Sequence, residues 1–260
     1  GQGESAYSIP EHRATYDPDM YYVEGYFIEQ FVKGEIGLLP SKDNKIGVIF
    51  DRAISKNVLN IHINTINAMK TVYGIDITGY EITDETAGVE FFTTDSGISS
   101  GCVKNPTTLK KTGQKLIKKG AQTIAVVCKF AEPPQDEYEK GNGVDIVGGV
   151  EAIISHYLSK ELMCPCVHAP AFEDVTIDGN IVDEKVSAEY ITPTFLPCLL
   201  TGLRNAPLIV KKENITPECI TYKNLHSVCV PYNALGSSVV LDCIEKDIPV
   251  YAILENKTVL

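Results

Sequence analysis

Residues 123–130, which read Thr-Ile-Ala-Val-Val-Cys-Lys-Phe, decide the fold of this 260-residue chain. The run is apolar, rich in β-branched side chains and interrupted by one charge, Lys129. Such a run is typical of a strand buried on both faces, as found in parallel sheets covered by helices. A helix is predicted just before it over 106–119, with Pro106 in its first turn and Gly120 after its end. The stretch therefore indicates an α/β unit.

The same alternation extends in both directions from this strand. Further strands are expected over 45–50, 75–82, 89–94, 164–168, 227–232 and 249–254. Further helices are expected over 57–73, 147–163, 195–203 and 237–246. Strands that alternate with helices of about ten or more residues indicate a parallel sheet covered by helices. We predict an α/β fold with a doubly wound, mostly parallel sheet and helices on both faces, in a Rossmann-like, three-layer arrangement.

The domain organisation is predicted to be simple. Residues 41–260 are expected to form a single α/β domain, with a candidate lobe boundary near 132–145, where Pro, Glu and Asp are frequent. Residues 1–40 lack a clear hydrophobic period and are expected to form an N-terminal arm or edge segment. This segment is rich in tyrosine, with Tyr7, Tyr16, Tyr21, Tyr22 and Tyr26. Aromatic side chains are enriched in interfaces, so we expect a homo-oligomer, a dimer.

The charge and the cysteines restrict the partners and the location. The chain has 34 acidic and 23 basic residues and a net charge of −11. Nucleic acids and anionic membranes bind clustered Lys and Arg, so neither is expected as a partner. No run approaches the roughly 18 apolar residues of a membrane span, and no secretory signal opens the chain. Eight cysteines, several inside apolar runs, indicate buried free thiols of a cytoplasmic protein.

Candidate site residues come from the strand ends, because open α/β sheets bind ligands outside the carboxyl ends of their strands. Polar residues predicted there include Asp51 and Arg52. The candidates for catalysis are His168, Cys166, Lys129 and Asp95. The candidates for substrate binding are Ser96, Ser99, Cys102, Asn233, Gly236, Ser237, Ser238 and Glu255. Neither a dinucleotide glycine fingerprint nor a phosphate-cradling loop with Lys is present, so no cofactor is predicted.

Two glycine- and serine-containing loops are candidates for contact with a polar substrate. The loop Asp95-Ser-Gly-Ile-Ser-Ser-Gly101 offers three hydroxyls and a carboxylate, although its composition is also that of an ordinary turn. Gly236-Ser-Ser238 precedes a predicted helix, whose free amides could hold a carboxylate or phosphate. The alternative for the second loop is plain N-capping by Ser237.

The strand containing Cys164, Cys166 and His168 is the main candidate for chemistry, because alternate residues point to one face. A thiolate beside an imidazole is an activated nucleophile or a proton-transfer pair. Zinc is an alternative, but a fourth ligand with suitable spacing is missing and no metal is predicted. In the remaining alternative both cysteines are core residues and only His168 reaches solvent. Lys129 must reach the edge or find a carboxylate, which makes it a candidate for a substrate carboxylate or a Schiff base.

Four stretches carry a resemblance to a known family: Tyr22-Val-Glu-Gly-Tyr26 and residues 144–156, 165–171 and 194–203. They resemble the domain-of-unknown-function family 3326, over about residue 20 to the C-terminus. The resemblance implies one coherent domain without a known activity. Its motif stretches contain or adjoin Glu24, Asp95, His168, Thr194 and Asn205, of which Thr194 joins the substrate-binding candidates. Members carry a further N-terminal segment, so Gly1 is not expected to be the native start.

A second similarity is to the aspartate/glutamate racemases, which use a Ser-Gly loop and two strand-end cysteines. Asp95-Ser-Gly97, Cys128 and Cys166-Val-His-Ala-Pro170 occur in a similar order, but Lys129 stands where that family has an Asn-Thr pair. The sequence as a whole predicts a small-molecule enzyme that acts on a carboxylate-bearing metabolite. It would be a cofactor-independent isomerase or racemase, lyase or amide hydrolase. The alternative is a non-catalytic metabolite-binding or assembly module.

Overall fold

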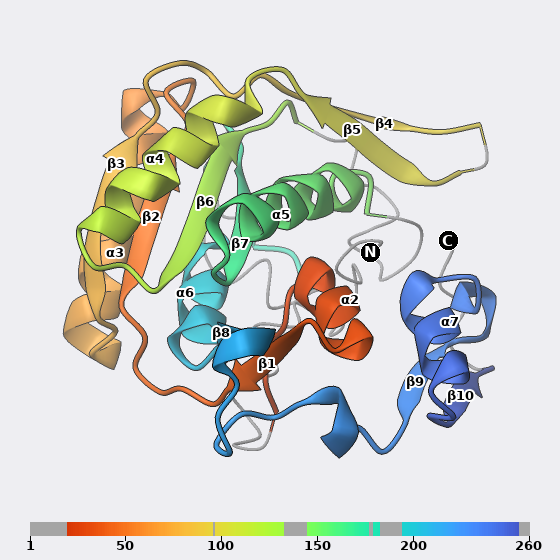
Figure 1. The fold of residues 1–260 in the computed structure, drawn as a ribbon. Coiled ribbons are helices and arrows are strands. Elements are labelled where there is room, and N and C mark those ends of the chain that lie inside the picture. Colours follow the sequence, from red (N-terminus) through yellow and green to blue (C-terminus); the bar gives the residue numbers. More distant parts are fainter. Residues whose placement is uncertain (1–19, 96, 133–144, 177–178, 183–193, 255–260) are drawn as a thin grey trace.

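The computed structural model describes residues 20–95, 97–132, 145–176, 179–182 and 194–254. Its centre is a four-stranded sheet in the order β3-β2-β6-β7 (Figure 1). These strands are β2 (Ile46–Phe50), β3 (Ile77–Ile82), β6 (Thr123–Lys129) and β7 (Cys166–Ala171). All three pairings are parallel. The predicted α/β class and the parallel sheet are confirmed, and the strand over 123–130 lies inside the sheet rather than at its edge.

Four helices pack against this sheet and bury side chains on its two faces. They are α3 (Lys56–Tyr73), α4 (Pro106–Lys118), α5 (Gly148–Leu162) and α6 (Leu196–Arg204). Val48 and Phe50 pack in a core cluster with residues of α3 and α6. Ile49, which points the other way, packs with residues of α4 and α5. Because successive residues of a strand face opposite sides, one apolar run fills both cores.

Helix α3 shows why these residues become helical. Its buried residues Val58, His62, Ile66 and Met69 recur every three or four positions and therefore share one face. The helix ends at Gly74, which adopts a left-handed conformation with φ 63°. Glycine carries no Cβ and takes this conformation without strain. The predicted helix over 57–73 and its glycine stop are confirmed.

Among the described residues, three two-stranded sheets lie outside the central one, so the expectation of a mostly parallel sheet holds only for the four central strands. β4 (Val89–Thr93) and β5 (Ser99–Val103) form an antiparallel hairpin, and β1 (Ile36–Leu39) pairs antiparallel with β8 (Leu208–Lys211). β9 (Val228–Pro231) and β10 (Val250–Ile253) form a separate parallel pair. A single sequence shows that a run is a strand but does not show which strand it pairs with.

The hairpin β4–β5 packs closely on the start of α5. A Cβ added to Gly149 would lie 2.2 Å from the carbonyl oxygen of Ser99, and one added to Gly101 would lie 2.6 Å from Cβ of Val150 on α5. Real Cβ atoms do not approach other atoms so closely. Glycine at both positions therefore permits the contact between the hairpin and the helix.

The described part of the expected N-terminal arm contains regular structure. Residues 25–33 form α2 (Gly25–Lys33), which begins after the cap residue Glu24 and ends at Gly34. Phe27 and Val32 of α2 are buried in a cluster with Cys243 of α7 (Ser238–Glu245). Residues 1–19 and most of the candidate lobe boundary, residues 133–144, lie outside the described residues.

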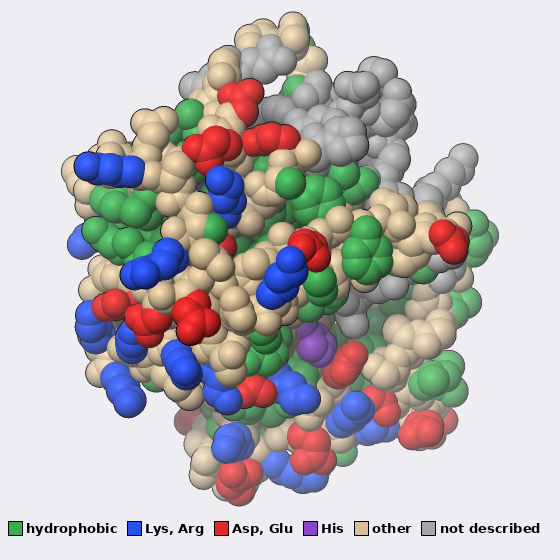
Figure 2. Space-filling model, turned by 90° about the horizontal axis from the view of Figure 1, so that it is seen from above, with side chains coloured by type: hydrophobic (Ala, Val, Ile, Leu, Met, Phe, Trp, Pro, Cys, Tyr) green, Lys and Arg blue, Asp and Glu red, His purple; other side chains and the backbone are tan. Residues whose placement is uncertain are grey.

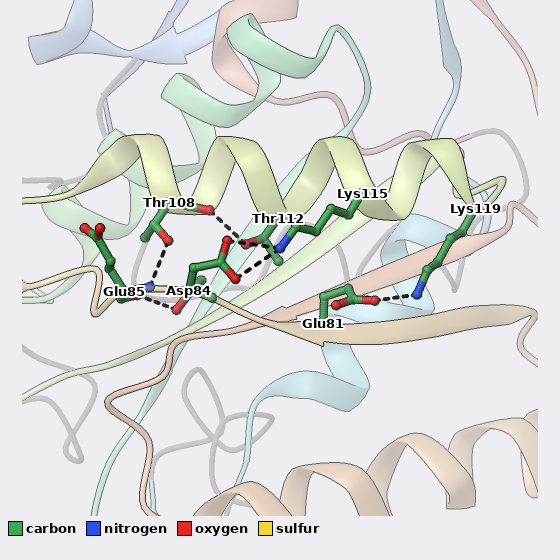
Figure 3. A network of polar contacts seen from close by, with 8 residues as sticks. Glu81, Asp84, Glu85, Thr108, Thr112, Lys115 and Lys119 are labelled. Atoms are coloured by element: carbon green, nitrogen blue, oxygen red, sulfur yellow. Dashed lines mark hydrogen bonds and ion pairs between the residues drawn. The ribbon is translucent and has the colours of Figure 1, made fainter.

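Polar contacts attach α4 and the residue that follows it to β3 and to the segment after β3 (Figure 3). Lys115 binds Asp84 at 3.0 Å, and Lys119 pairs with Glu81. The backbone N–H of Glu85 donates to the hydroxyl of Thr108 at 3.3 Å. Exposed ion pairs contribute little stability individually, but together with the Thr108 contact they orient the segment after β3. That segment continues to Ala87, whose backbone N–H donates to the side chain of Asp51, the residue after β2.

Candidate functional site

The carboxyl ends of the four parallel strands lie at the top of Figure 1. Asp51 follows β2 directly, Lys129 is the last residue of β6, and Glu173 follows β7. Figure 2 looks onto this end of the molecule, where acidic and basic side chains lie beside one another with hydrophobic side chains between them. The sheet therefore places polar residues of three segments at one edge.

Asp51 is the central group of this edge. Its side chain is buried, with only 2% of the residue exposed. Oδ1 accepts hydrogen bonds from the backbone N–H groups of Ala87 at 3.0 Å and Ala53 at 3.1 Å. Oδ2 accepts from the backbone N–H of Lys129 at 3.3 Å. One carboxylate thus connects the end of β2, the end of β6 and the segment after β3.

Lys129 reaches the surface and has a carboxylate partner. Its Nζ lies 3.2 Å from Oε2 of Glu173, and the two side chains are 40% and 55% exposed. The nearby Ser55 hydroxyl and the Lys129 ammonium lower the pKa of Glu173, so Glu173 is a carboxylate at neutral pH. Oε1 of Glu132 accepts from the N–H groups of Glu173 at 2.8 Å and Asp174 at 3.1 Å. These contacts place Glu173 next to the end of β6.

His168 lies inside the protein rather than at a strand end. Its Nδ1 is 3.1 Å from Oε1 of Glu151, and its Nε2 accepts from the backbone N–H of Cys128 at 3.2 Å. Its ring stacks on that of Phe130, with 5.0 Å between the centroids. Burial lowers the pKa of His168 to about 3. The imidazole is therefore neutral, donates through Nδ1–H and has both nitrogens occupied, so its predicted role as acid or base stays a prediction.

The cysteines on and near β7 are paired with each other rather than with His168. The Sγ atoms of Cys164 and Cys166 are 3.9 Å apart. Burial raises the pKa of Cys166 well above its ordinary value, and burial does the same for Cys128. Both buried thiols are protonated at neutral pH, whereas a nucleophilic cysteine needs a lowered pKa.

The loop after residue 95 is the turn of the β4–β5 hairpin. The N–H of Thr94 donates to the carbonyl of Ile98 at 2.9 Å, and Asp95 is exposed at the tip. The hydroxyl of Ser99 donates to the carbonyl of Ile146 and accepts from the N–H of Gly149. Ser99 therefore holds the hairpin on α5. Ser96 lies outside the described residues.

The other predicted binding residues occupy several places. The thiol of Cys102 on β5 is exposed, 3.7 Å from Oε2 of Glu90. Thr194 is buried and accepts from the N–H of Leu196 at 3.2 Å, at the start of α6. The side chain of Asn233 and all of Glu255 lie outside the part that the structure describes.

Ser237 caps α7, with its hydroxyl accepting from the N–H of Val240 at 3.3 Å. Gly236, Ser237 and Ser238 are exposed, and α7 packs with α2 and β10, away from the central sheet (Figure 1). The observed contact is the N-capping that was the alternative to an anion site. Ser237 follows β9, which pairs with β10, whereas Lys129 ends β6 of the central sheet, so the structure does not bring them together as expected from the sequence.

The structure brings together two groups that sequence reasoning did not select. Glu151 becomes the partner of His168 because α5 packs across β7, and Glu132 contacts the loop after β7. The chain has 34 acidic residues, so an acidic side chain alone does not mark a site. Of the two, only Glu151 could have been noticed in the sequence, as a charged residue on the buried face of a predicted helix. Within the described ranges, no three His, Cys, Asp or Glu side chains are close enough to hold a metal ion.

The fold and this edge define an α/β protein with a parallel central sheet. A family model described as "Protein of unknown function (DUF3326)" matches residues 14–260. The chain belongs to this family, as its motif stretches had indicated.

A relative from Synechococcus sp., named an uncharacterised lipoprotein, is 34% identical over 247 residues. The match covers 94% of this chain and 68% of the relative. The relative's name contradicts the cytoplasmic location that we expected from the cysteines and the absence of a signal segment. Among the described helices, none combines the length and the apolar character needed to cross a bilayer.

Proposed function

We propose that this protein binds a carboxylate-bearing small molecule at the carboxyl edge of the central sheet, between β2 and β6. The chain leaves β2 toward β3 on one side and later leaves β6 toward β7 on the other. Read as a doubly wound, Rossmann-like unit, the sheet has its switch point between these two strands. Ligands of such sheets bind outside the carboxyl ends at this point.

The ion pair between Lys129 and Glu173 is the observation that carries the proposal. Lys129 ends a strand whose other residues are buried, and its ammonium is in water at the switch point. Its partner comes from the loop after β7 and is more than half exposed. An exposed ion pair contributes roughly 0–1 kcal/mol, so a ligand carboxylate can replace Glu173 at small cost.

Binding is favoured over catalysis by His168 because the structure encloses that residue. Both ring nitrogens have protein partners, and the low pKa of His168 keeps it neutral. The racemase similarity gains no support from the thiols of Cys128 and Cys166, which are buried and protonated. A cofactor-independent isomerase, lyase or amide hydrolase would have to use other groups at this edge.

Titration of the purified protein with small carboxylic acids and their amides, followed by calorimetry, tests the proposal. Aspartate, glutamate, succinate and malonate are suitable probes. We expect acids to bind more tightly than amides, and Lys129→Ala to weaken binding at least about tenfold, the loss of one charge-assisted contact. Lys118→Ala is the matched control, because the exposed Lys118 ends α4 near the start of β6, at the opposite edge of the sheet. Equal affinity of the Lys129 and Lys118 variants would rule out this site.

Assembly is the second candidate function, favoured by exposed apolar side chains on α7 and β10. Leu241 and Ile244 of α7 are 56% and 58% exposed, and Tyr251 of β10 is 54% exposed. Clustered exposed apolar side chains mark interaction surfaces. Sedimentation of the parent and of a Leu241→Ser, Ile244→Ser variant tests the expected dimer, which the variant should dissociate. For location, the relative's name supports a lipoprotein.

A further inference from the structure

Cys164 and Cys166 form a close dithiol at the amino end of β7, far along the strand from the binding edge at Ala171. Their Sγ atoms are 3.9 Å apart, and the Cys166 thiol also donates to the carbonyl of Cys164 at 3.3 Å. The spacing has a local cause. Pro165 disfavours a helical conformation of Cys164 and fixes its own φ, so the backbone is extended and both side chains share one face.

The two thiols differ in their access to solvent. Cys166 is the first residue of β7 and is fully buried in the core cluster beside α4 and α5. Cys164 lies between the end of α5 and β7 and is partly exposed. Met163, in a left-handed conformation with φ 53°, makes the turn that brings Cys164 to this position. The thiol of Cys164 can therefore react with a reagent from solution, whereas the thiol of Cys166 is enclosed and can react only with Cys164.

We propose that Cys164 and Cys166 are a modification site, at which a low-molecular-weight disulfide oxidises the pair to an intramolecular disulfide. Cys164, as the thiolate, attacks one sulfur of the reagent, and the other sulfur leaves as a thiolate. Cys166 then attacks Sγ of Cys164 while its proton passes to the departing sulfur of the reagent, which leaves as the second thiol. Two protein thiols are oxidised and one reagent disulfide is reduced to two thiols, so atoms and electrons balance.

The required movement is small and is concentrated on the exposed partner. A disulfide holds its sulfur atoms about 2.0 Å apart, so the pair must close by roughly 2 Å. This approach is assigned to rotation of the partly exposed Cys164 side chain, because the Cys166 thiol is enclosed in the core. Two other cysteines, Cys102 and Cys229, are exposed and lie far from this turn in the sequence. They serve as internal controls for simple surface reactivity.

The experiment exposes the protein to glutathione disulfide, alkylates the remaining thiols and measures the peptide that contains both residues. We expect this peptide to be lighter by two hydrogen atoms and to take up no alkylating reagent, a loss of two of the eight thiols. Dithiothreitol should restore both. Two separately alkylated thiols at positions 164 and 166, under conditions where Cys102 and Cys229 carry glutathione, would overturn the proposal.

Single variants separate the two roles. Cys166→Ala should leave Cys164 trapped as a stable mixed disulfide with glutathione, whereas Cys164→Ser should leave Cys166 reduced. Cys102→Ser, the control, should keep the internal disulfide. Should Cys166→Ala fail to fold, the order of events in the parent decides: a transient glutathione adduct on Cys164 must precede the loss of both thiols. An adduct first seen on Cys166 would contradict the assignment.

Discussion

His168 and Glu151 form a buried pair that joins β7 to α5, with 3.1 Å between Nδ1 of His168 and Oε1 of Glu151. The histidine side chain has no exposed surface, and the glutamate side chain is 11% exposed. Nε2 of the same ring accepts from the backbone N–H of Cys128. The neutral imidazole thus connects β6, β7 and α5 through two directional contacts.

The burial of His168 predicts that the free energy of unfolding decreases when the pH is lowered. Folded His168 has a pKa of about 3, below its ordinary value of 6.5, so between these values the unfolded chain binds more protons. Stability is therefore lost as the pH falls from 6.5 toward 3, by about 1 kcal/mol per pH unit. Buried His62, whose pKa is also lowered, adds to the same trend. Urea unfolding at pH 7.5, 6.5 and 5.5 measures it.

Two histidine variants test whether His168 causes this pH dependence. His168→Gln cannot take up a proton, so its free energy of unfolding should change less between pH 7.5 and 5.5 than that of the parent. His226→Gln, at an exposed position, should keep the slope of the parent. Identical slopes for the parent and the His168 variant would show that His168 does not cause the effect.

Asp51 is expected to be a major determinant of stability at the binding edge. Asp51→Ala removes the acceptor of three backbone N–H groups, those of Ala53, Ala87 and Lys129, and should cost about 3 kcal/mol. Asp51→Asn keeps one acceptor but turns an NH₂ group toward another donor, so it should also destabilise. Asp76→Asn, at an exposed position, is the control. Chemical denaturation that finds all three variants equally stable would contradict the contacts.

Gly149→Ala should destabilise the protein although alanine favours helices. The new Cβ would lie 2.2 Å from the carbonyl oxygen of Ser99, so the β4–β5 hairpin must move away from α5, at a cost of about 2 kcal/mol. Gly236→Ala is the matched control, because nothing lies within 4 Å of its added Cβ. Melting temperatures of the two variants should differ clearly. A Gly149→Ala protein as stable as the parent would show that the hairpin does not pack here as observed.

Asn44→Asp should disturb the end of α6. Nδ2 of the buried Asn44 donates to the carbonyls of Leu203 at 2.9 Å and Ala206 at 2.7 Å. A carboxylate there would face two carbonyl oxygens, so we expect a loss of about 3 kcal/mol at pH 7. Acid should reduce this loss as the new carboxyl takes up a proton. Asn60→Asp, on the exposed face of α3, is the control, and urea midpoints at pH 7 and 5 give the comparison.

Much of the secondary structure follows from short-range patterns. The helices α3 and α4 were predictable from a repeating apolar face with glycine or proline at the ends, and the strand β6 from its unbroken apolar run. Helix α2 was not predicted, because it has only nine residues, of which Phe27, Phe31 and Val32 are buried. Such a short helix gives little periodic signal in the sequence. Its apolar face becomes recognisable only from the packing against Cys243 and its neighbours.

The candidate site was predictable in location but less so in composition. Lys129 and Asp51 lie at the carboxyl edge because the ends of adjacent parallel strands must meet. Asp95 and Ser237 also follow predicted strands, yet those strands pair outside the central sheet. Pairing depends on contacts between residues distant in sequence, which a single chain read locally does not reveal.

The sequence by itself determined the class of fold, the central strand over 123–130 and the family. These properties depend on local backbone preference, on apolar periodicity and on short sequence motifs, all of which are present in the unfolded chain. Only the tertiary structure decided that His168 is enclosed by Glu151 and Cys128, that Lys129 pairs with Glu173, and that the thiols of Cys164 and Cys166 lie side by side. Burial and the approach of distant groups set the charge and reactivity of a side chain, and both arise only when the chain is packed.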